Sequence, residues 1–213
     1  MPNLKPEQQL LFDEGRLLPL MEDFYTIQGE GGNTGKPAYF IRLGGCDVGC
    51  HWCDVKESWN ADLHPLTLAD EIVSKAASFP AKAVVVTGGE PLIYNLDYLC
   101  ERFKLNGIQT FIETSGAYPH SGDWDWICLS PKKFKKPVQS MLDRAHELKV
   151  IVFNQSDFEW AEEYAEQVNT TCRLFLQPEW SKSEKMMPKI IEYVKNNPKW
   201  NISLQTHKFM HIP

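Results

Sequence analysis

Short apolar runs alternate along the chain with stretches in which apolar residues recur every three or four positions. Runs rich in Val, Ile, Leu and Phe are typical of buried strands, whereas the recurring pattern is typical of amphipathic helices. The apolar runs predict strands over residues 37–43, 82–86, 108–112, 126–129, 148–153, 172–176 and 201–204. The periodic stretches predict helices over residues 67–78, 96–105, 156–168 and 184–196, the first with Thr67 near its N-cap.

This alternation is typical of a mainly parallel sheet whose strands are connected by crossover helices. The strands are too few for a closed eight-stranded barrel. The sequence therefore predicts an α/β fold built as an incomplete, open barrel. No repeat or linker divides the chain, so we expect residues 1–213 to form a single domain, with residues 1–21 as a polar leader.

Charge and composition exclude several classes of protein. The chain has 213 residues and a net charge of −6, which disfavours a nucleic-acid binder because such proteins need a basic face. No apolar run is long enough to cross a bilayer, and the N-terminus does not resemble a signal peptide. We therefore expect a cytoplasmic protein without a membrane partner, in which Cys100, Cys128 and Cys172 are reduced, buried hydrophobes.

The other three cysteines lie within eight residues, as Cys46-x-x-x-Cys50-x-x-Cys53. Thiolates are the natural ligands of iron–sulfur clusters, and three of them leave one iron of a [4Fe–4S] cluster open. The alternative is zinc, bound by Cys50, Cys53, His207 and His211. That interpretation requires a much longer gap than the usual 12–20 residues, on the order of half the chain, and leaves Cys46 unused.

The cysteine spacing, with Trp52 before the last cysteine, resembles that of the radical S-adenosylmethionine superfamily. Thr87-Gly88-Gly89-Glu90-Pro91 follows one strand–helix unit later and is similar to the superfamily's Gly-Gly-Glu motif. The resemblance implies that S-adenosylmethionine chelates the open iron, and that one electron from the cluster cleaves it to a 5′-deoxyadenosyl radical. Glycines let a ligand approach the backbone, and the Glu90 carboxylate suits the cofactor's ammonium group.

Further motifs resemble one branch of that superfamily, the 7-carboxy-7-deazaguanine synthases of queuosine biosynthesis, a tRNA-modification pathway. The match runs from about residue 22 to the end, and its motifs are Phe24-Tyr25-Thr26-Ile27-Gln28-Gly29-Glu30-Gly31, Gly35-x-Pro37-Ala38, Phe40-Ile41-Arg42-Leu43, Leu129-Ser130-Pro131-Lys132, Leu176-Gln177-Pro178, Gln205-Thr206-His207-Lys208 and Pro213. The resemblance implies a lyase acting on 6-carboxy-5,6,7,8-tetrahydropterin. The radical removes a hydrogen from C6, the ring contracts, ammonia leaves, and S-adenosylmethionine is regenerated.

The resemblance also implies which residues bind each molecule. The cofactor contacts would be Trp52, Cys53, Asp54, Gly89, Ser130, Pro131, Lys132, Gln177, Pro178, Glu179 and Trp180. The substrate contacts would be Ile27, Gln28, Gly29, Arg42, Thr87, His207 and Pro213. Arg42 could form a bidentate pair with the substrate carboxylate or a structural salt bridge, and His207 could be structural. Ile202 and Leu204 could anchor the functional tail as a strand.

Magnesium is the point at which the chain departs from the family pattern. The family holds this ion with the hydroxyl of a Thr or Ser directly after Cys-Asp, and Val55 occupies that position here. Valine has no side-chain oxygen, and magnesium prefers oxygen ligands. Either substrate, water and a residue such as Asp54 hold the ion, or it is dispensable, so we expect a weakened magnesium dependence.

The family resemblance further implies a homodimer and an electron donor such as flavodoxin or ferredoxin. Two other functions are compatible with the cysteines. A glycyl-radical enzyme activase would also carry them, but the Gln-Gly-Glu-Gly, Ser-Pro-Lys and Thr-His-Lys segments argue against it. A non-catalytic iron–sulfur electron carrier needs no Gly-Gly-Glu motif and normally uses four cysteines. The lysines at 132, 133, 135 and 136 form a basic loop, in which only Lys132 is assigned a role.

Overall fold

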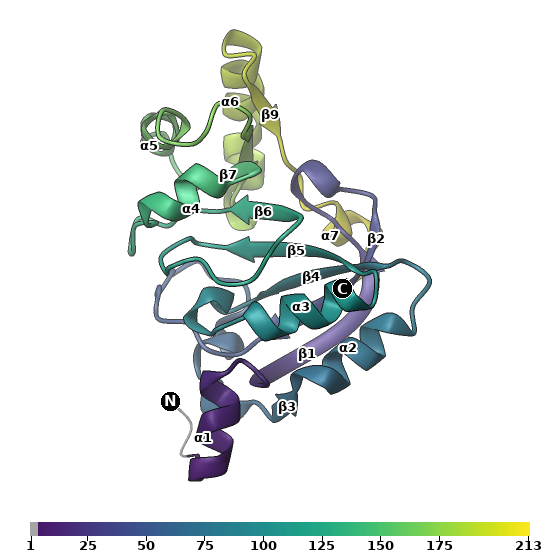
Figure 1. The fold of residues 1–213 in the computed structure, drawn as a ribbon. Coiled ribbons are helices and arrows are strands. Elements are labelled where there is room, and N and C mark those ends of the chain that lie inside the picture. The colour runs from purple at the N-terminus through teal and green to yellow at the C-terminus, as the bar shows by residue number, and fades with distance from the viewer. Residues whose placement is uncertain (1–3) are drawn as a thin grey trace.

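The computed structural model describes residues 4–213 and arranges them around a twisted sheet with helices packed against it (Figure 1). Within these residues, nine strands pair in the order β3-β1-β2-β4-β5-β6-β7-β8-β9. The strands are β1 (Leu17–Ile27), β2 (Pro37–Leu43), β3 (Leu66–Leu68), β4 (Ala83–Gly88), β5 (Gln109–Thr114), β6 (Trp126–Leu129), β7 (Glu147–Val152), β8 (Arg173–Pro178) and β9 (Trp200–Ile202).

The helices lie mostly in the connections between parallel strands. They are α1 (Pro6–Asp13), α2 (Ala69–Ala77), α3 (Asp97–Leu105), α4 (Gln139–Arg144), α5 (Asp157–Ala165), α6 (Ser183–Asn196) and α7 (Thr206–Met210). Among residues 4–213, no helix combines the length and the apolarity needed to cross a membrane.

The sheet is mostly parallel and does not close. Strands β2 and β4 to β9 run parallel to one another, whereas β1 is antiparallel to both β2 and β3. Strands β3 and β9 stand at the two ends of the pairing order, so the sheet remains open. This confirms the predicted incomplete α/β barrel.

The predicted periodicities correspond to buried faces. In α2, Ala69, Ile72, Val73 and Ala76 form the buried stripe of an amphipathic helix. The central residues of β4, Val84–Val86, are almost inaccessible to solvent, as expected of a strand covered on both faces. Side chains alternate between the faces of each strand, so one face packs on the helices and the other faces the barrel interior.

The structure differs from the sequence prediction mainly near the N-terminus. Residues 6–27, mostly within the predicted polar leader, form α1 and the long strand β1. Glu22 and Asp23 make β1 look polar in sequence, but Leu17 and Leu18 are buried and pair with β3. Thr67 lies in β3 rather than at the N-cap of α2, because it pairs with Leu18.

The C-terminal segment also differs from its prediction. Strand β9 ends at Ile202, and Leu204 is 39% exposed rather than anchored in the sheet. The chain then turns into α7, which lies next to the segment that follows β1 (Figure 1). The backbone N–H of Thr206 donates to the carbonyl of Gly29 at 2.9 Å. The tail is therefore held by a loop at the end of β1 rather than by the sheet.

The direction of β1 determines how the candidate site is assembled. Parallel strands place their carboxyl ends at one edge of the sheet, where ligands usually bind. Because β1 runs antiparallel to β2, its own carboxyl end lies at the opposite edge, near the start of β2. Residues 28–36 thus approach the barrel interior from the side opposite the cysteine loop.

Candidate active site

A single cavity of about 210 Å³ collects most of the residues that the motifs single out. Its walls come from the loops that follow β2, β4, β5, β6 and β8, together with inward-facing residues of β5 and β7. The predicted cluster, cofactor and substrate residues that line it are Cys46, Cys50, Cys53, Trp52, Asp54, Thr87, Gly89, Ser130, Lys132, Gln177, Pro178, Glu179 and Trp180.

The cysteine loop is tied to the sheet through its backbone. The N–H of Cys46 donates to the carbonyl of Trp59, and the N–H of Glu90 donates to the carbonyl of Gly45. Cys50 is buried, Cys46 and Cys53 are half-buried, and all three are free thiols. Burial raises the pKa of Cys46 and raises that of Cys50 to about 11. Three thiols facing one cavity fit an iron–sulfur cluster, whose binding would displace their protons.

The Gly-Gly-Glu turn can only be built with glycines. Gly88 has a φ of +129°, and a Cβ there would lie 2.2 Å from the carbonyl oxygen of Leu43. A Cβ on Gly89 would lie 2.1 Å from the carbonyl oxygen of Gly45. The turn is therefore packed directly against the start of the cysteine loop, which brings the two motifs to the same wall of the cavity.

Glu90 is engaged by the protein itself. Its carboxylate accepts hydrogen bonds from the N–H of Leu92, the hydroxyl of Thr114, and both the N–H and hydroxyl of Ser115. The sequence suggests this carboxylate as a partner for the cofactor's ammonium. In the structure, its hydrogen bonds instead lock the end of β4 to the end of β5.

Lys132 forms the wall beside the cysteines. Its Nζ donates to the carbonyl and hydroxyl oxygens of Ser130, at 2.7 and 2.6 Å, and lies 5.6 Å from the centre of the Trp52 ring. Burial lowers the pKa of Lys132, and Cys50 opposes that change. Pro131 does not line this cavity but borders a neighbouring hollow next to His51.

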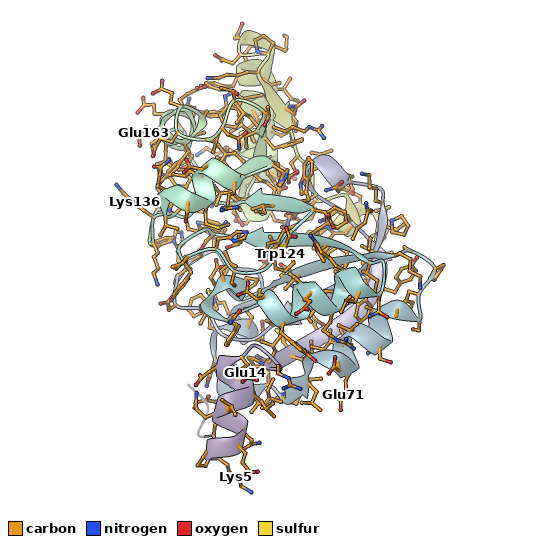
Figure 2. The ribbon with its side chains drawn as sticks, in the orientation of Figure 1. Lys5, Glu14, Glu71, Trp124, Lys136 and Glu163 are labelled. Atoms are coloured by element: carbon orange, nitrogen blue, oxygen red, sulfur yellow. The ribbon has the colours of Figure 1, made fainter. Side chains whose placement is uncertain are left out.

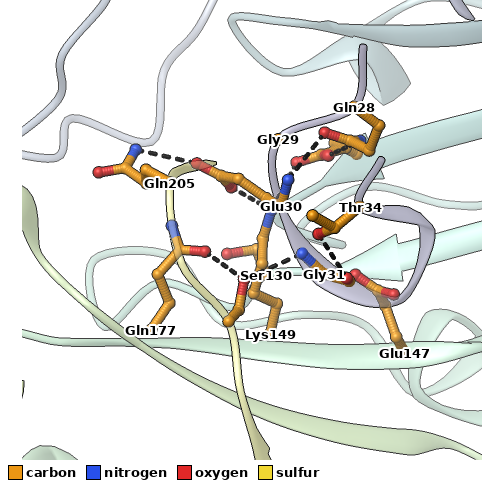
Figure 3. Close-up of polar contacts among 12 residues, drawn as sticks. Gln28, Gly29, Glu30, Gly31, Thr34, Ser130, Glu147, Lys149, Gln177 and Gln205 are labelled. Atoms are coloured by element: carbon orange, nitrogen blue, oxygen red, sulfur yellow. Dashed lines mark hydrogen bonds and ion pairs between the residues drawn. The ribbon is translucent and has the colours of Figure 1, made fainter. Parts of the chain in front are cut away.

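The interior end of the cavity is a buried ion triad (Figure 3). The Nζ of Lys149 lies 2.5 Å from Glu30 Oε2 and 2.7 Å from Glu113 Oε2. Gln205 donates to the other oxygen of Glu30, and Gln28 donates to the other oxygen of Glu113. Lys149 comes from β7 and Glu113 from β5, while Glu30 and Gln28 come from the loop after β1.

Charge pairing outweighs desolvation in this triad. Burial alone would raise the pKa of Glu30, but the charge and hydrogen bond of Lys149 and the amide of Gln205 lower it to about 2. Burial also disfavours the charged form of Lys149, yet Cys128, Glu113 and Glu30 raise its pKa well above the ordinary value. The Glu30 carboxylate and the Lys149 ammonium are therefore both charged at neutral pH.

The predicted substrate residues are distributed more widely than the cofactor residues. Gln28 is buried against Glu113, whereas Ile27 at the end of β1 is 37% exposed. Gly29 lies against His207, because a Cβ on Gly29 would sit 2.3 Å from the ring Nδ1. Pro213 is exposed and is not part of the cavity wall.

Arg42 makes a salt bridge in this structure. Its Nε lies 2.6 Å from Glu22 Oε1, and its guanidinium lies 6.0 Å from the centre of the Phe24 ring. It does not line the cavity, but it pairs in register with Thr87, which does. Arg42 is thus one strand away from the cavity, on the β1 side.

The cavity residues missing from the sequence-based site include the four that meet at its interior end: Glu30, Glu113, Lys149 and Gln205. Glu30 and Gln205 lie within recognised motifs, and Glu113 ends a predicted strand. Lys149 is the clearest missed signal, because it is a lone charge inside an apolar strand. Charged residues are almost never fully buried unless they are paired, so Lys149 implied a buried carboxylate partner.

The metal alternatives find little support. In the part of the chain that the structure describes, no three His, Cys, Asp or Glu side chains are preassembled as a metal site, and this holds for the three loop cysteines as well as for the alternative zinc set. At the magnesium position Val55 offers no side-chain oxygen, and the Ser58 hydroxyl donates to the Val55 carbonyl. Asp54 pairs with Lys208 at 3.6 Å. These residues do not fit the family's magnesium site.

The chain is similar to several known proteins. Residues 40–152 match the Radical SAM superfamily model. The 7-carboxy-7-deazaguanine synthase of Flavobacterium psychrophilum is 61% identical over 99% of this chain and 100% of its own length. That of a Synechocystis species is 46% identical over 91% and 93%. The crystal structure of QueE from Escherichia coli matches with a TM-score of 0.82 and 30% identity, covering 94% of this chain and 99% of that one.

Glu30→Gln should change how stability depends on pH. The folded-state pKa of Glu30, about 2, lies below its ordinary value of 4.5, so its stabilising effect is complete above the ordinary value and lost as pH falls toward 2. We expect the variant to melt at a lower temperature than the unmodified protein near neutral pH, and the difference to shrink on acidification. Thermal unfolding of the cluster-free proteins, followed by circular dichroism, measures this. A difference in melting temperature that stays constant down to about pH 3 would contradict the charged state of Glu30 in the triad. The matched control is Glu192→Gln, which changes an exposed glutamate.

Proposed function

Because the chain belongs to the 7-carboxy-7-deazaguanine synthase family of the radical S-adenosylmethionine superfamily, we propose that it converts 6-carboxy-5,6,7,8-tetrahydropterin to 7-carboxy-7-deazaguanine, with loss of ammonia, in queuosine biosynthesis. The observation that carries the proposal is one cavity with three cysteines at its outer wall and the Glu30–Lys149–Glu113 triad at its interior end. Such a cavity can hold a radical source and a polar heterocycle side by side.

Cys46, Cys50 and Cys53 would hold the [4Fe–4S] cluster, and S-adenosylmethionine would lie between it and the residues of the β6 and β8 loops. When bound, these two groups supply a one-electron reduction that generates the radical needed for hydrogen removal. The protein's contribution is orientation and exclusion of water. The proposed cofactor contacts are Trp52, Asp54, Gly89, Ser130, Pro131, Lys132, Gln177, Pro178, Glu179 and Trp180.

The triad would recognise the aminopyrimidinone edge of the substrate. That edge presents N–H donors, and ionised carboxylates are strong acceptors for them. Gln28 and Gln205 hold the other carboxylate oxygens, so the orientation of Glu30 and Glu113 is fixed before the substrate arrives. Ile27 and the backbone of Gly29 would form the neighbouring part of the substrate site, next to His207 and the tail that ends at Pro213.

The substrate carboxylate would be directed away from the triad, because the triad holds two carboxyl groups and only one ammonium group. Thr87 lies on the cavity wall nearest β1, and Arg42 is its paired neighbour one strand closer to β1. For Arg42 to bind the substrate carboxylate, its guanidinium must exchange or share Glu22. Glu22 and the substrate carboxylate would therefore compete for the Arg42 guanidinium. A bidentate pair between the guanidinium and the substrate carboxylate would favour the substrate in this competition.

The two other candidate functions are less well supported. An activase must admit a glycine on a protein loop, whereas here the residues 28–30 and the tail occupy the interior end of the cavity. An electron carrier has no use for a buried, ion-paired interior. Neither alternative explains Lys149 or the two carboxylates that it pairs with.

Anaerobic reconstitution tests the proposed reaction. With iron, sulfide, S-adenosylmethionine, dithionite and carboxytetrahydropterin, we expect 7-carboxy-7-deazaguanine by liquid chromatography and mass spectrometry. Cys53→Ala should abolish product by removing a cluster ligand, whereas Cys172→Ala, which changes an isolated cysteine, should retain most activity. No deazaguanine from the unmodified protein would refute the proposal. Absence of 5′-deoxyadenosine under every condition would favour an electron carrier.

We also propose that catalysis depends only weakly on magnesium, because Val55 lacks the hydroxyl that the family uses. Product formation after treatment with a chelator should remain close to that of the untreated enzyme. Val55→Thr should restore a response to added magnesium, and Val55→Ala is its matched control. Complete loss of activity on chelation of the unmodified enzyme, reversed by magnesium alone, is the contrary result.

We also propose that the protein is a cytoplasmic homodimer. A flavodoxin or ferredoxin would supply its electrons. A small apolar cluster of Ala38, Phe40 and Val85, flanked by Phe24, Ala83 and Phe111, lies apart from the main core. It borders a hollow on the interior side of β1, β2, β4 and β5 that a second copy could cover. Light scattering after size-exclusion chromatography should give twice the molar mass of one chain. Phe111→Glu should shift the protein to monomer, and a monomeric unmodified enzyme would overturn this assignment.

A further inference from the structure

A group of aromatic and lysine side chains lies directly outside the cysteine loop. We name it the lysine–aromatic surface and define it by His51, Lys133, Phe134, Lys136, Phe153 and Lys182. His51 stands between two of the cluster cysteines in sequence, and its ring is edge-on to Phe134 at 5.6 Å and to Phe153 at 5.4 Å between centres. Phe134 is 51% exposed, so apolar ring surface reaches solvent beside the loop.

Several lysines gather at this surface, although the whole chain has a net charge of −6. Lys133 pairs with Asp157, and the nearby Lys135 pairs with Asp47. Lys136 is exposed and lies at the outer edge of the molecule in Figure 2. Lys182 lies 5.2 Å from the centre of the Phe153 ring. Within residues 4–213, neither Lys136 nor Lys182 makes an ion pair, so both charges are available to a partner.

The surface is separated from the main cavity by very little protein. A hollow of about 90 Å³ lies under it, bordered by His51, Phe134, Phe153 and Trp160. Trp52 and Lys132 border this hollow as well as the main cavity, so they form the partition between the two. An electron arriving at His51 is therefore adjacent to both Cys50 and Cys53.

We propose that the lysine–aromatic surface is the docking site for a small acidic protein that carries one electron on a flavin or iron–sulfur centre. This inference rests on the proposed function, which requires such an electron. One electron leaves the reduced carrier and enters the oxidised cluster held by the three cysteines. The carrier is oxidised by one electron, the cluster is reduced by one, and no atom or proton is transferred.

Charge complementarity selects an acidic partner. Complementary charges chiefly accelerate and orient encounter, and weak redox complexes bury small interfaces of less than about 1,200 Å². An exposed aromatic ring surrounded by lysines suits such a contact, because aromatic residues supply much of the binding energy at small interfaces. A nucleic acid would need a wider basic face than this acidic chain offers.

The first experiment measures binding without catalysis. An oxidised flavodoxin of strongly negative charge is bound to the cluster-containing enzyme and followed by biolayer interferometry at low salt. Reversing both free charges, in Lys136→Glu with Lys182→Glu, should raise Kd by about tenfold or more. Lys195→Glu, an exposed reversal at the far end of α6, should leave Kd close to that of the unmodified enzyme. Phe134→Ala should also weaken binding.

The second experiment separates docking from the integrity of the site. In stopped flow, reduced flavodoxin should bleach the cluster absorbance at least about tenfold more slowly in the double variant. Dithionite, which needs no docking surface, should reduce both proteins at the same rate. Neither readout needs the pterin substrate, so failure of the proposed reaction would be seen separately.

Three results would overturn the proposal. The double variant could bind and accept electrons from flavodoxin as the unmodified enzyme does. Lys195→Glu could weaken binding equally, which would indicate attraction to charge in general. Finally, a transfer RNA could displace the flavodoxin from this surface at equal or lower concentration, which would assign the lysines to nucleic acid.

Discussion

The buried ammonium of Lys149 is the interaction on which the arrangement of the site depends. It joins Glu113 of β5 to Glu30 of the loop after β1, and each carboxylate is held further by a glutamine. Removing one partner from a buried ion pair typically costs about 3–5 kcal/mol, because the remaining charge is left without compensation. That cost forces the loop after β1 to enter the barrel. The same charges leave polar acceptors facing the interior end of the cavity.

Two halves of the site thus come from opposite edges of one sheet. The cysteine and Gly-Gly-Glu segments follow parallel strands, as is usual for ligand sites in α/β proteins. Residues 28–30 come from the other edge, because β1 is the antiparallel member of the sheet. An open barrel permits this arrangement, since a closed barrel would be filled by its own side chains. The missing closure is therefore what makes room for a second binding segment.

Much of the fold and the outer half of the site could be predicted from the sequence. The strand at 37–43 and the turn at 87–91 are local features whose apolar runs and glycines directly require those conformations. Strand β1 was missed because Glu22 and Asp23 interrupt its apolar pattern, and its pairing with β2 and β3 is a tertiary property. Arg42 was identified by its motif, but its salt bridge with Glu22 depends on a strand that the sequence had not revealed.

The wall of the cavity is completed by a segment that is synthesised after all of its other parts. Gln205 is the last residue in its wall, and every other wall residue precedes it in the chain. Thr206 and Lys208 then tie the same segment to Gly29 and Asp54, which emerged from the ribosome long before. Domains generally fold from the N-terminus during synthesis, so the cysteine loop is formed while the interior end is still unsealed. A chain that stops before residue 205 would have its cysteines in place but would lack the Gln205 amide that holds Glu30 at the interior end.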